Sequence, residues 1–334
     1  MSRHQASRRT SLTAFAAVLI AWSAGAVRAQ EYPTRPIRMI VPFSPGGSTD
    51  LTARLVAREA EKRLGRPIII DNKPGAAAMI GLNELVGSKP DGYTIGMTNS
   101  GMVTQSLYGV ARYNYATDLQ AIAQVGEVPF VLAVRADAPW KSVEDLVDYA
   151  RANPGAIKYG ITGFGNTSHL GPEQFALLAR IKMDPVNFDG GSPLIAALLG
   201  GHIQAAGNNP VDLKEQVKAG KIRVLMVYGD HRLTDPLYQD VPTAREKGYD
   251  VVVTLWQGVG APKGLPEAIK KKLGDVFTSV LADPQMREQV TALGLEPAAM
   301  GPDEFGAKWI SDQERIRKIV TDTGILDIVK GQSR

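Results

Sequence analysis

The sequence contains no cysteine among its 334 residues. Disulfides, thiol catalysis, zinc ribbons and iron–sulfur clusters all need cysteine sulfur, so these are excluded. Histidine is also scarce, at four residues, and neither an H-E-x-x-H nor a G-x-S-x-G motif occurs. Without such motifs or a cluster of metal-ligating residues, nothing in the sequence predicts a metal, a cofactor or a catalytic triad.

A basic excess is also absent once the first 29 residues are set aside. The whole chain has 38 basic and 34 acidic residues and a net charge of +4. Four arginines and no acidic residue lie in residues 1–29, so 34 basic residues balance 34 acidic ones from Gln30 onward. A net charge of zero removes the electrostatic reason to expect nucleic-acid binding.

Residues 1–29 have the pattern of an export signal. Three arginines precede an apolar stretch of roughly 15 residues, shorter than the ~20 of a comfortable membrane span. Residues 27–29 (VRA) or 24–26 (AGA) suit a signal peptidase, and an uncleaved anchor is the alternative. Residues 7–12 (SRRTSL) match a twin-arginine signal in part, so that route and general secretion are both open. Either route predicts a periplasmic or extracellular mature chain, in which no later stretch is apolar enough to span a bilayer.

The rest of the chain has the composition of a folded protein. Apolar residues make up 44% and charged residues 22%, which argues against disorder. The length exceeds that of one ordinary domain, so we expect two. With 34 glycines and 21 prolines, many tight turns are expected.

A strand–helix–strand unit opens the mature chain. Residues 37–42 are an apolar strand, and 50–64 place Leu51, Leu55, Val56 and Leu64 on one helical side before a stop at Gly65. Residues 67–71 form the next strand. A crossover of this length predicts a parallel sheet with helices on its faces.

The alternation continues to the end of the chain. We expect further strands over 93–98, 121–125, 130–134, 157–159, 186–188, 203–206, 224–228 and 251–255. We expect helices over 80–86, 103–108, 142–153, 168–180, 193–199 and 212–218, with Leu170, Phe175, Leu177 and Leu178 in the core. The chain closes with helices over 265–281, 284–293 and 303–321. It would cross between two lobes near 130–135 and 252–260.

Three glycine-rich loops each connect a predicted strand to a predicted helix. They lie at 43–50 (FSPGGSTD), 163–169 (GFGNTSH) and 188–193 (FDGGSP). In open α/β sheets, ligands bind beyond the carboxyl ends of strands, where the N–H groups and dipole of a helix start favour an anion. No loop is a P-loop or a dinucleotide fingerprint, and a tight turn with no ligand is the alternative for each.

Other neutral residues also follow predicted strands. Thr98 and Asn99 come after one strand and Asn209 after another. Trp256 ends a strand at a predicted crossover, where it would line a cleft or pack at a hinge. His169 lies in the first turn of a predicted helix, and a structural role is favoured over ligand binding.

These features are typical of an exported binding protein. One alternative is an exported hydrolase or isomerase that uses His169 with Ser168 or Asp50. Adjacent Ser and His in sequence do not by themselves make a nucleophile–base pair, so this alternative is disfavoured. A sensor that binds a solute and signals to a membrane partner would share the fold and the site.

Motifs over residues 31–330 resemble one family when taken together. In order they are Tyr32-Pro33, Pro36-Ile37, Pro42-Phe43, Pro45-Gly46-Gly47, Thr49-Asp50, 71–76 (DNKPGA), 90–94 (PDGYT), Gly165 with 168–170 (SHL), 196–201 (AALLGG), Ala261-Pro262 and 264–266 (GLP). Each motif alone is weak, but their order and spacing are specific. The chain resembles the substrate-binding component of tripartite tricarboxylate transporters, also called the Bug family of periplasmic receptors.

The resemblance implies an α/β, two-lobed periplasmic-binding-protein-like (Venus flytrap) fold with C-terminal helices. We expect an export signal over 1–29, a first lobe over 30–132 plus 256–334, and a second lobe over 133–255. The family clamps a carboxylate between its lobes, largely through backbone amides and water, for delivery to membrane transporter subunits.

The expected ligand-binding residues come from the motifs and from the loops. The resemblance places the carboxylate near Ser44, Gly46, Gly47, Thr49 and Asp50, with Thr167, Ser168 and Gly191 reaching it from the opposite lobe. The loop positions add Phe43, Thr98, Asn99, Phe164, Gly190, Asn209 and Trp256.

Departures from the family pattern bear on the identity of the ligand. Ala77-Ala78 replace the usual glycines, Gln204 stands where many relatives carry Asp, and Phe188 where Tyr is common. Together with Phe43, Phe164 and Trp256, Phe188 would make the cleft more apolar than a citrate site. This pattern favours an aromatic or semi-apolar carboxylate as the ligand.

Overall fold

A computed structural model describes residues 32–109, 111–188 and 191–327 of the chain. The predicted export signal and Gly190 lie outside the described residues. From Arg35 on, the described chain forms one compact unit. Within these ranges, no helix is both long and apolar enough to cross a bilayer.

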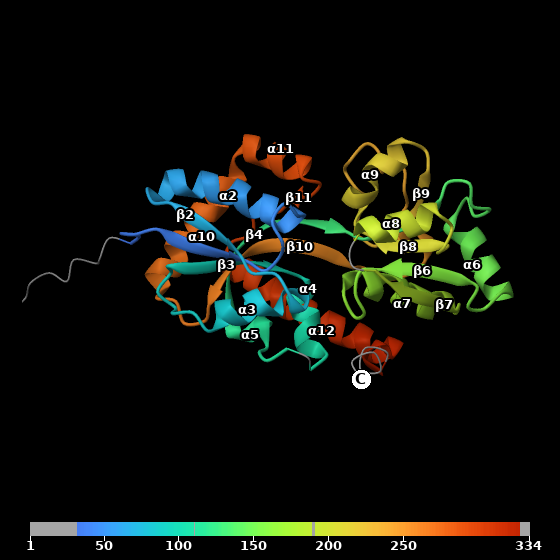
Figure 1. The fold of residues 1–334 in the computed structure, drawn as a ribbon, viewed down its shortest axis with the longest axis horizontal. Coiled ribbons are helices and arrows are strands. Elements are labelled where there is room, and N and C mark those ends of the chain that lie inside the picture. Colours follow the sequence, from blue (N-terminus) through green and yellow to red (C-terminus); the bar gives the residue numbers. More distant parts are fainter. Residues whose placement is uncertain (1–31, 110, 189–190, 328–334) are drawn as a thin grey trace, which may run out of the picture. The chain divides into compact units, whose positions relative to one another are not determined.

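The first of two sheets contains β1 and the strands that return to it late in the chain (Figure 1). Its order is β11-β4-β10-β3-β1-β2, with bounds Glu296–Pro297, Leu119–Pro129, Thr254–Pro262, Thr94–Asn99, Ile37–Val41 and Ile68–Asn72. β1 is parallel to β2 and β3, which confirms the predicted crossover. β10 is antiparallel to β3 and β4, so the sheet as a whole is mixed.

The second sheet is built from the middle of the chain. Its order is β7-β6-β8-β5-β9, with bounds Met183–Asn187, Ile157–Ile161, Ala205–Asn208, Val131–Arg135 and Ile222–Val227. β6 is parallel to β7 and β8, whereas β5 is antiparallel to β8 and β9. The chain passes from the first sheet to the second at Phe130, and returns between β9 and β10.

Helices cover both sheets (Figure 1). Over the first sheet, one face carries α2 (Ser48–Leu64), α10 (Glu267–Ala282) and α11 (Pro284–Ala292). The other face carries α3 (Met79–Val86), α5 (Tyr115–Asp118) and α12 (Pro302–Thr323), with α4 (Gly101–Leu107) packed on α12. The second sheet carries α6 (Val143–Ala152), α7 (Thr167–Ala179), α8 (Gly191–Leu199) and α9 (Pro210–Lys218), and α12 also contacts α7. Short 3₁₀ turns span Ala76–Ala78 and Arg245–Lys247.

The helix ends follow their sequence signals. α2 ends at Gly65, whose φ of 68° permits the left-handed turn that lets its N–H reach Glu61 O. α6 begins with a capping box between Ser142 and Asp145, as the spacing predicts. These caps set the boundaries of helices that packing then holds in place.

The strand predicted over 251–255 was placed too early in the chain, because β10 runs over Thr254–Pro262. Gly258 and Gly260 weaken the strand signal in the sequence. In the fold, a Cβ at Gly258 would lie 2.3 Å from Phe305 Cε1, so glycine is needed for α12 to pack on the strand. The packing of α12 on β10 thus requires Gly258, and this glycine weakens the strand pattern in the sequence.

The prediction that Leu177 and Leu178 lie in the core was also wrong, since both are exposed, whereas Leu170 and Phe175 are buried as predicted. Leu51, on the apolar side predicted for α2, is exposed as well. The buried stripe of α7 instead includes Gly171 and Ala176. A Cβ at Gly171 would lie 2.9 Å from the Tyr228 ring, so small residues allow this face to approach its neighbours closely. Leu177 and Leu178 therefore point outward.

Candidate functional site

The first candidate loop leads from the carboxyl end of β1 into α2. Gly47 is the N-cap of α2 and supplies no side chain to cap it. The first backbone bond into the helix runs from Leu51 N to Gly47 O, at 3.0 Å. The N–H groups of Ser48, Thr49 and Asp50 precede that bond, so helix geometry leaves them no acceptor within the helix. Together with the helix dipole, they form a site suited to an anion.

The Asp50 carboxylate organises this loop and is fully engaged in doing so. Its Oδ2 accepts from Gly46 N at 2.8 Å and from Arg54 Nε at 2.9 Å. Its Oδ1 accepts from Asn72 Nδ2 at 2.9 Å, and the same Nδ2 also donates to Phe43 O at 3.0 Å. Gly46 has a φ of 82°, which a side chain would disfavour. Asp50 is therefore suited to positioning, and its backbone N–H is the group left for a ligand.

The charge of Asp50 is retained although the residue is buried. Burial by itself raises the pKa of Asp50, but hydrogen bonds from Arg54, Gly46 and Asn72, with the Arg54 charge, lower this pKa to about 2. The side chain is ionised and paired at neutral pH, so it adds little net negative potential beside the helix start.

A cluster of neutral polar side chains lies next to the start of α2. Gln257 Nε2 donates to Ser48 Oγ at 3.0 Å, and Gln257 is the β-ladder partner of Asn99. Asn99 Oδ1 accepts from Gly101 N. Ser100 Oγ and Gln257 Oε1 are buried and have no hydrogen-bond partner within the described part of the chain. Buried polar atoms of this kind are normally satisfied, so a ligand or a water would complete the cluster.

The second candidate loop leads from β6 into α7. Asn166 caps this helix, since its Oδ1 accepts from Ser168 N at 3.0 Å and from Ser168 Oγ at 2.5 Å. Ser168 Oγ also accepts from Thr162 N at 2.9 Å, so this hydroxyl is engaged inside the loop. Thr167 is buried, and the half-buried Phe164 packs edge-on against His169.

The third loop and the loop after β8 also lead into helix starts. Gly191 is the first residue of α8. Asn209 caps α9, because its Oδ1 accepts from Val211 N at 3.0 Å. Asn208 Oδ1 accepts from Asn209 N at 2.8 Å, while its buried Nδ2 lacks a partner within the described ranges. Asn208 Nδ2 is thus a donor at the carboxyl end of β8.

Two further predicted residues have their side chains in the core. Thr98 Oγ1 donates to Gly258 O at 3.1 Å and is 1% exposed. Trp256 is fully buried, and its Nε1 donates to Asp312 Oδ2 at 2.7 Å. Its ring stacks on Trp309. The structure thus gives Trp256 the packing role that the sequence left open beside the cleft-lining one.

The arrangement offers no support for catalysis by His169. His169 Nδ1 accepts from Gly165 N at 2.9 Å, and the residue is fully buried. Ser168 Oγ is bonded to Asn166 and Thr162, and the Asp50 carboxylate is bonded within its own loop. Across the described residues, no group of three or more His, Asp or Glu could hold a metal ion.

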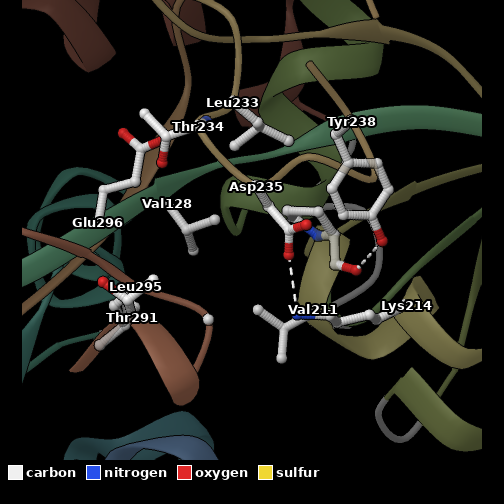
Figure 2. A pocket seen from close by; sticks show the side chains of 12 residues that line it. Val128, Val211, Lys214, Leu233, Thr234, Asp235, Tyr238, Thr291, Leu295 and Glu296 are labelled. Atoms are coloured by element: carbon white, nitrogen blue, oxygen red, sulfur yellow. Dashed lines mark hydrogen bonds and ion pairs between the residues drawn. The ribbon is translucent and has the colours of Figure 1, made fainter. Parts of the chain in front are cut away.

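A small pocket lies between β4 and β11 on one side and α9 on the other, beside the loop after β8 (Figure 2). Tyr238 hydroxyl donates to Pro210 O at 2.7 Å, and Lys214 pairs with Asp235 at 2.8 Å (Figure 2). The volume is about 40 Å³, enough for a few water molecules. None of the predicted site residues that the structure describes lines this pocket.

The structure also brings in residues that the predicted set omitted. Ser48, Asn72 and Gln257 join the α2 loop through the hydrogen bonds given above. Asn72 was detectable, because it ends a strand parallel to β1 and so lies at the same sheet edge. Gln257 had no local signal, since its place beside Ser48 depends on β10 returning to pair with β3.

The two-sheet fold is that of a periplasmic solute-binding protein, since the chain is similar to the periplasmic binding protein BugD at 30% identity and a TM-score of 0.75, covering 88% of this chain and 99% of that one. The family model described as "Tripartite tricarboxylate transporter family receptor" matches residues 52–325, and the chain belongs to that family. It is 33% identical to BugT of Bordetella pertussis over 321 residues, covering 94% of this chain and 98% of BugT.

Solved structures give the same result. The chain is similar to R. palustris Rpa4515 with adipate, at 30% identity and a TM-score of 0.78, covering 88% of this chain and 98% of that one. It is also similar to MatC from Rhodopseudomonas palustris with bound malate, at 28% identity and a TM-score of 0.74, covering 86% and 100%. The two-lobed, periplasmic-binding-protein-like fold expected from the sequence is confirmed.

Proposed function

We propose that the protein is an exported receptor that captures a small carboxylate and delivers it to a tripartite tricarboxylate-type membrane transporter. In this proposal residues 1–29 are a cleaved signal, exported by the general or the twin-arginine route. The ligand is held between a first lobe (30–132 plus 256–334) and a second lobe (133–255). Family membership and relatives that carry adipate and malate support the carboxylate.

The uncapped first turn of α2 is the observation that carries the assignment. Its N–H groups lie at the carboxyl end of β1, and the loop before it is fixed by Asp50 and Asn72. Because neutral donors and a helix dipole supply the attraction, an anion can bind there without a side-chain cation. Ser44, Gly46, Gly47 and Thr49 complete this half of the site.

The second lobe supplies the remaining contacts in this proposal. Thr167 N–H is the first amide of α7, and the start of α8 at Gly191 adds another. Asn208 Nδ2 is a further donor with no partner among the described residues. Half-buried Phe43 and Phe164 flank the two loops and favour an apolar portion in the ligand.

The test removes one amide proton from the first turn of α2. Ser48→Pro deletes that N–H at the first helical position, where proline is well tolerated. Gly47 already has a φ of −77° and a ψ of 167°, which suits a residue before proline. Ser48→Ala is the matched control, because it removes only the hydroxyl.

Binding of residues 30–334 would be measured by calorimetry against adipate, malate, citrate and benzoate. A hydrogen bond to a charged group is worth about 1.5–3 kcal/mol, so Ser48→Pro should weaken carboxylate binding about 10-fold or more. Ser48→Ala should weaken binding less. Both variants remove the hydroxyl that accepts from buried Gln257 Nε2, so both should lower the melting temperature by a similar amount. Failure of every carboxylate to bind wild-type protein would reject the proposed function. Preference for citrate over benzoate and adipate would reject the semi-apolar ligand.

A further inference from the structure

Gly165 is held on both sides of its backbone by groups from different parts of the fold. Its N–H donates to His169 Nδ1 at 2.9 Å, within the loop and helix that follow β6. Its carbonyl accepts from Tyr108 Oη at 2.6 Å. Tyr108 directly follows α4, which packs against the first sheet. Gly165 is therefore hydrogen-bonded both to His169 of its own lobe and to Tyr108 of the lobe built on the first sheet.

His169 fixes the Gly165 N–H from within the second layer. Because Nδ1 accepts a hydrogen bond, the ring carries a proton on Nε2. Nε2 is buried and has no hydrogen-bond partner among the described residues. Glu173 Oε1 lies 3.6 Å from it and accepts a hydrogen bond from the Tyr159 hydroxyl. Phe164 packs edge-on against the imidazole, which is fully buried and presents no atom to the solvent.

Tyr108 provides the contact from the first layer. The side chain is 5% exposed, and burial raises its pKa, so the phenol keeps the proton that it donates. A buried donor that loses its acceptor raises the free energy of the protein. The Tyr108–Gly165 hydrogen bond therefore resists separation of the two lobes. Any movement that parts α4 from the β6–α7 loop must break it.

We propose that Tyr108 is a positioning residue that latches the β6–α7 loop when the two lobes close on the ligand. The proposal rests on the proposed function, because it assigns Tyr108 a role in retaining the carboxylate. Tyr108 does not touch the ligand. Its hydroxyl and the His169 ring together fix the backbone of Gly165. The positions of the nearby Phe164 and Thr167 amides depend on that backbone.

Tyr108→Phe tests the latch, with Tyr149→Phe as the matched control. Tyr149 lies on α6 and is 40% exposed, so its hydroxyl has no part in the latch. The first readout needs no ligand: hydrogen–deuterium exchange of a peptide covering residues 160–170. Loss of one neutral hydrogen bond predicts exchange about 3- to 10-fold faster in Tyr108→Phe and unchanged in Tyr149→Phe.

The second readout is stopped-flow binding of the carboxylate that wild-type protein binds in calorimetry. Parting of the lobes to release the ligand must break the Tyr108–Gly165 hydrogen bond, so the dissociation rate should rise about 3- to 10-fold with the association rate unchanged. A loop that is merely misfolded would also slow association, which would overturn the proposal. Unchanged exchange, or faster exchange with unchanged dissociation, would overturn it too. If wild-type protein binds no carboxylate, the proposed function fails, and the exchange measurement still decides whether Tyr108 fastens the loop.

Discussion

Replacing Asp50 by Asn should destabilise the protein in a way that depends on pH. The substitution keeps the shape of the side chain but removes its charge and one acceptor oxygen. One of the three donors that meet this carboxylate, from Gly46, Arg54 and Asn72, would then face an NH₂ group. The loop before α2 would then lose part of the hydrogen bonding that holds its amides in place.

The magnitude follows from the pKa of Asp50. Its pKa falls from 3.8 to about 2 on folding, and each unit is worth 1.36 kcal/mol, so the carboxylate contributes about 2 kcal/mol at pH 7. The side chain is 3% exposed, which limits screening by solvent. Since the folded pKa lies below the unfolded one, this contribution is complete above about pH 5 and is lost as pH falls toward 2.

The assay is urea unfolding at pH 7 and at pH 3, followed by linear extrapolation of the free energy of unfolding. The difference between wild type and Asp50→Asn should be about 2 kcal/mol at pH 7 and about 1 kcal/mol at pH 3. Asp275→Asn is the control, because Asp275 forms an exposed pair with Lys271. It should cost at most about 0.5 kcal/mol. An Asp50→Asn cost no larger than the control, or one that is equal at both pH values, would refute the reasoning.

Three further substitutions test the packing around the site. Trp256→Phe should lower the free energy of unfolding by about 1–3 kcal/mol in calorimetry, because Asp312 loses its indole donor. Gly294→Ala should destabilise by more than about 1 kcal/mol in urea unfolding, since φ is 82° and a Cβ would lie 2.1 Å from Val211 Cγ2; Val211→Ala in the same chain should recover part of that loss. Asn166→Ala should cost about 0.5–2 kcal/mol by thermal unfolding through loss of the α7 cap, and no change would contradict the capping role.

Several elements could be read from local sequence because local physics decides them. The β1–α2–β2 crossover is encoded by an apolar run, a helical apolar pattern and Gly65 in the left-handed conformation. The cap of α6 follows from Ser142 and Asp145 at the start of that helix. The Gly46–Gly47 loop was placed for the same reason, because it lies between two elements that were already clear.

Other features depended on contacts between distant segments. β10 was shifted in the prediction because Gly258 hides a strand that α12 needs to approach closely. Leu177 and Leu178 point outward because the small residues of α7 face the core. The hydrophobicity of the α7 sequence does not determine which of its faces is buried, because that depends on which segments pack against the helix.

The sequence by itself determined the class of the protein: an α/β chain with paired sheets, three anion-suited loops and no catalytic set. Only the tertiary structure decided what each site residue does. In the structure the Asp50 carboxylate is hydrogen-bonded within its own loop. Gln257 lies beside Ser48, although the two are far apart in the sequence, and Trp256 is buried in the core. The physical reason is that a side chain's role depends on its partners, and these partners come from strands and helices far away in the chain.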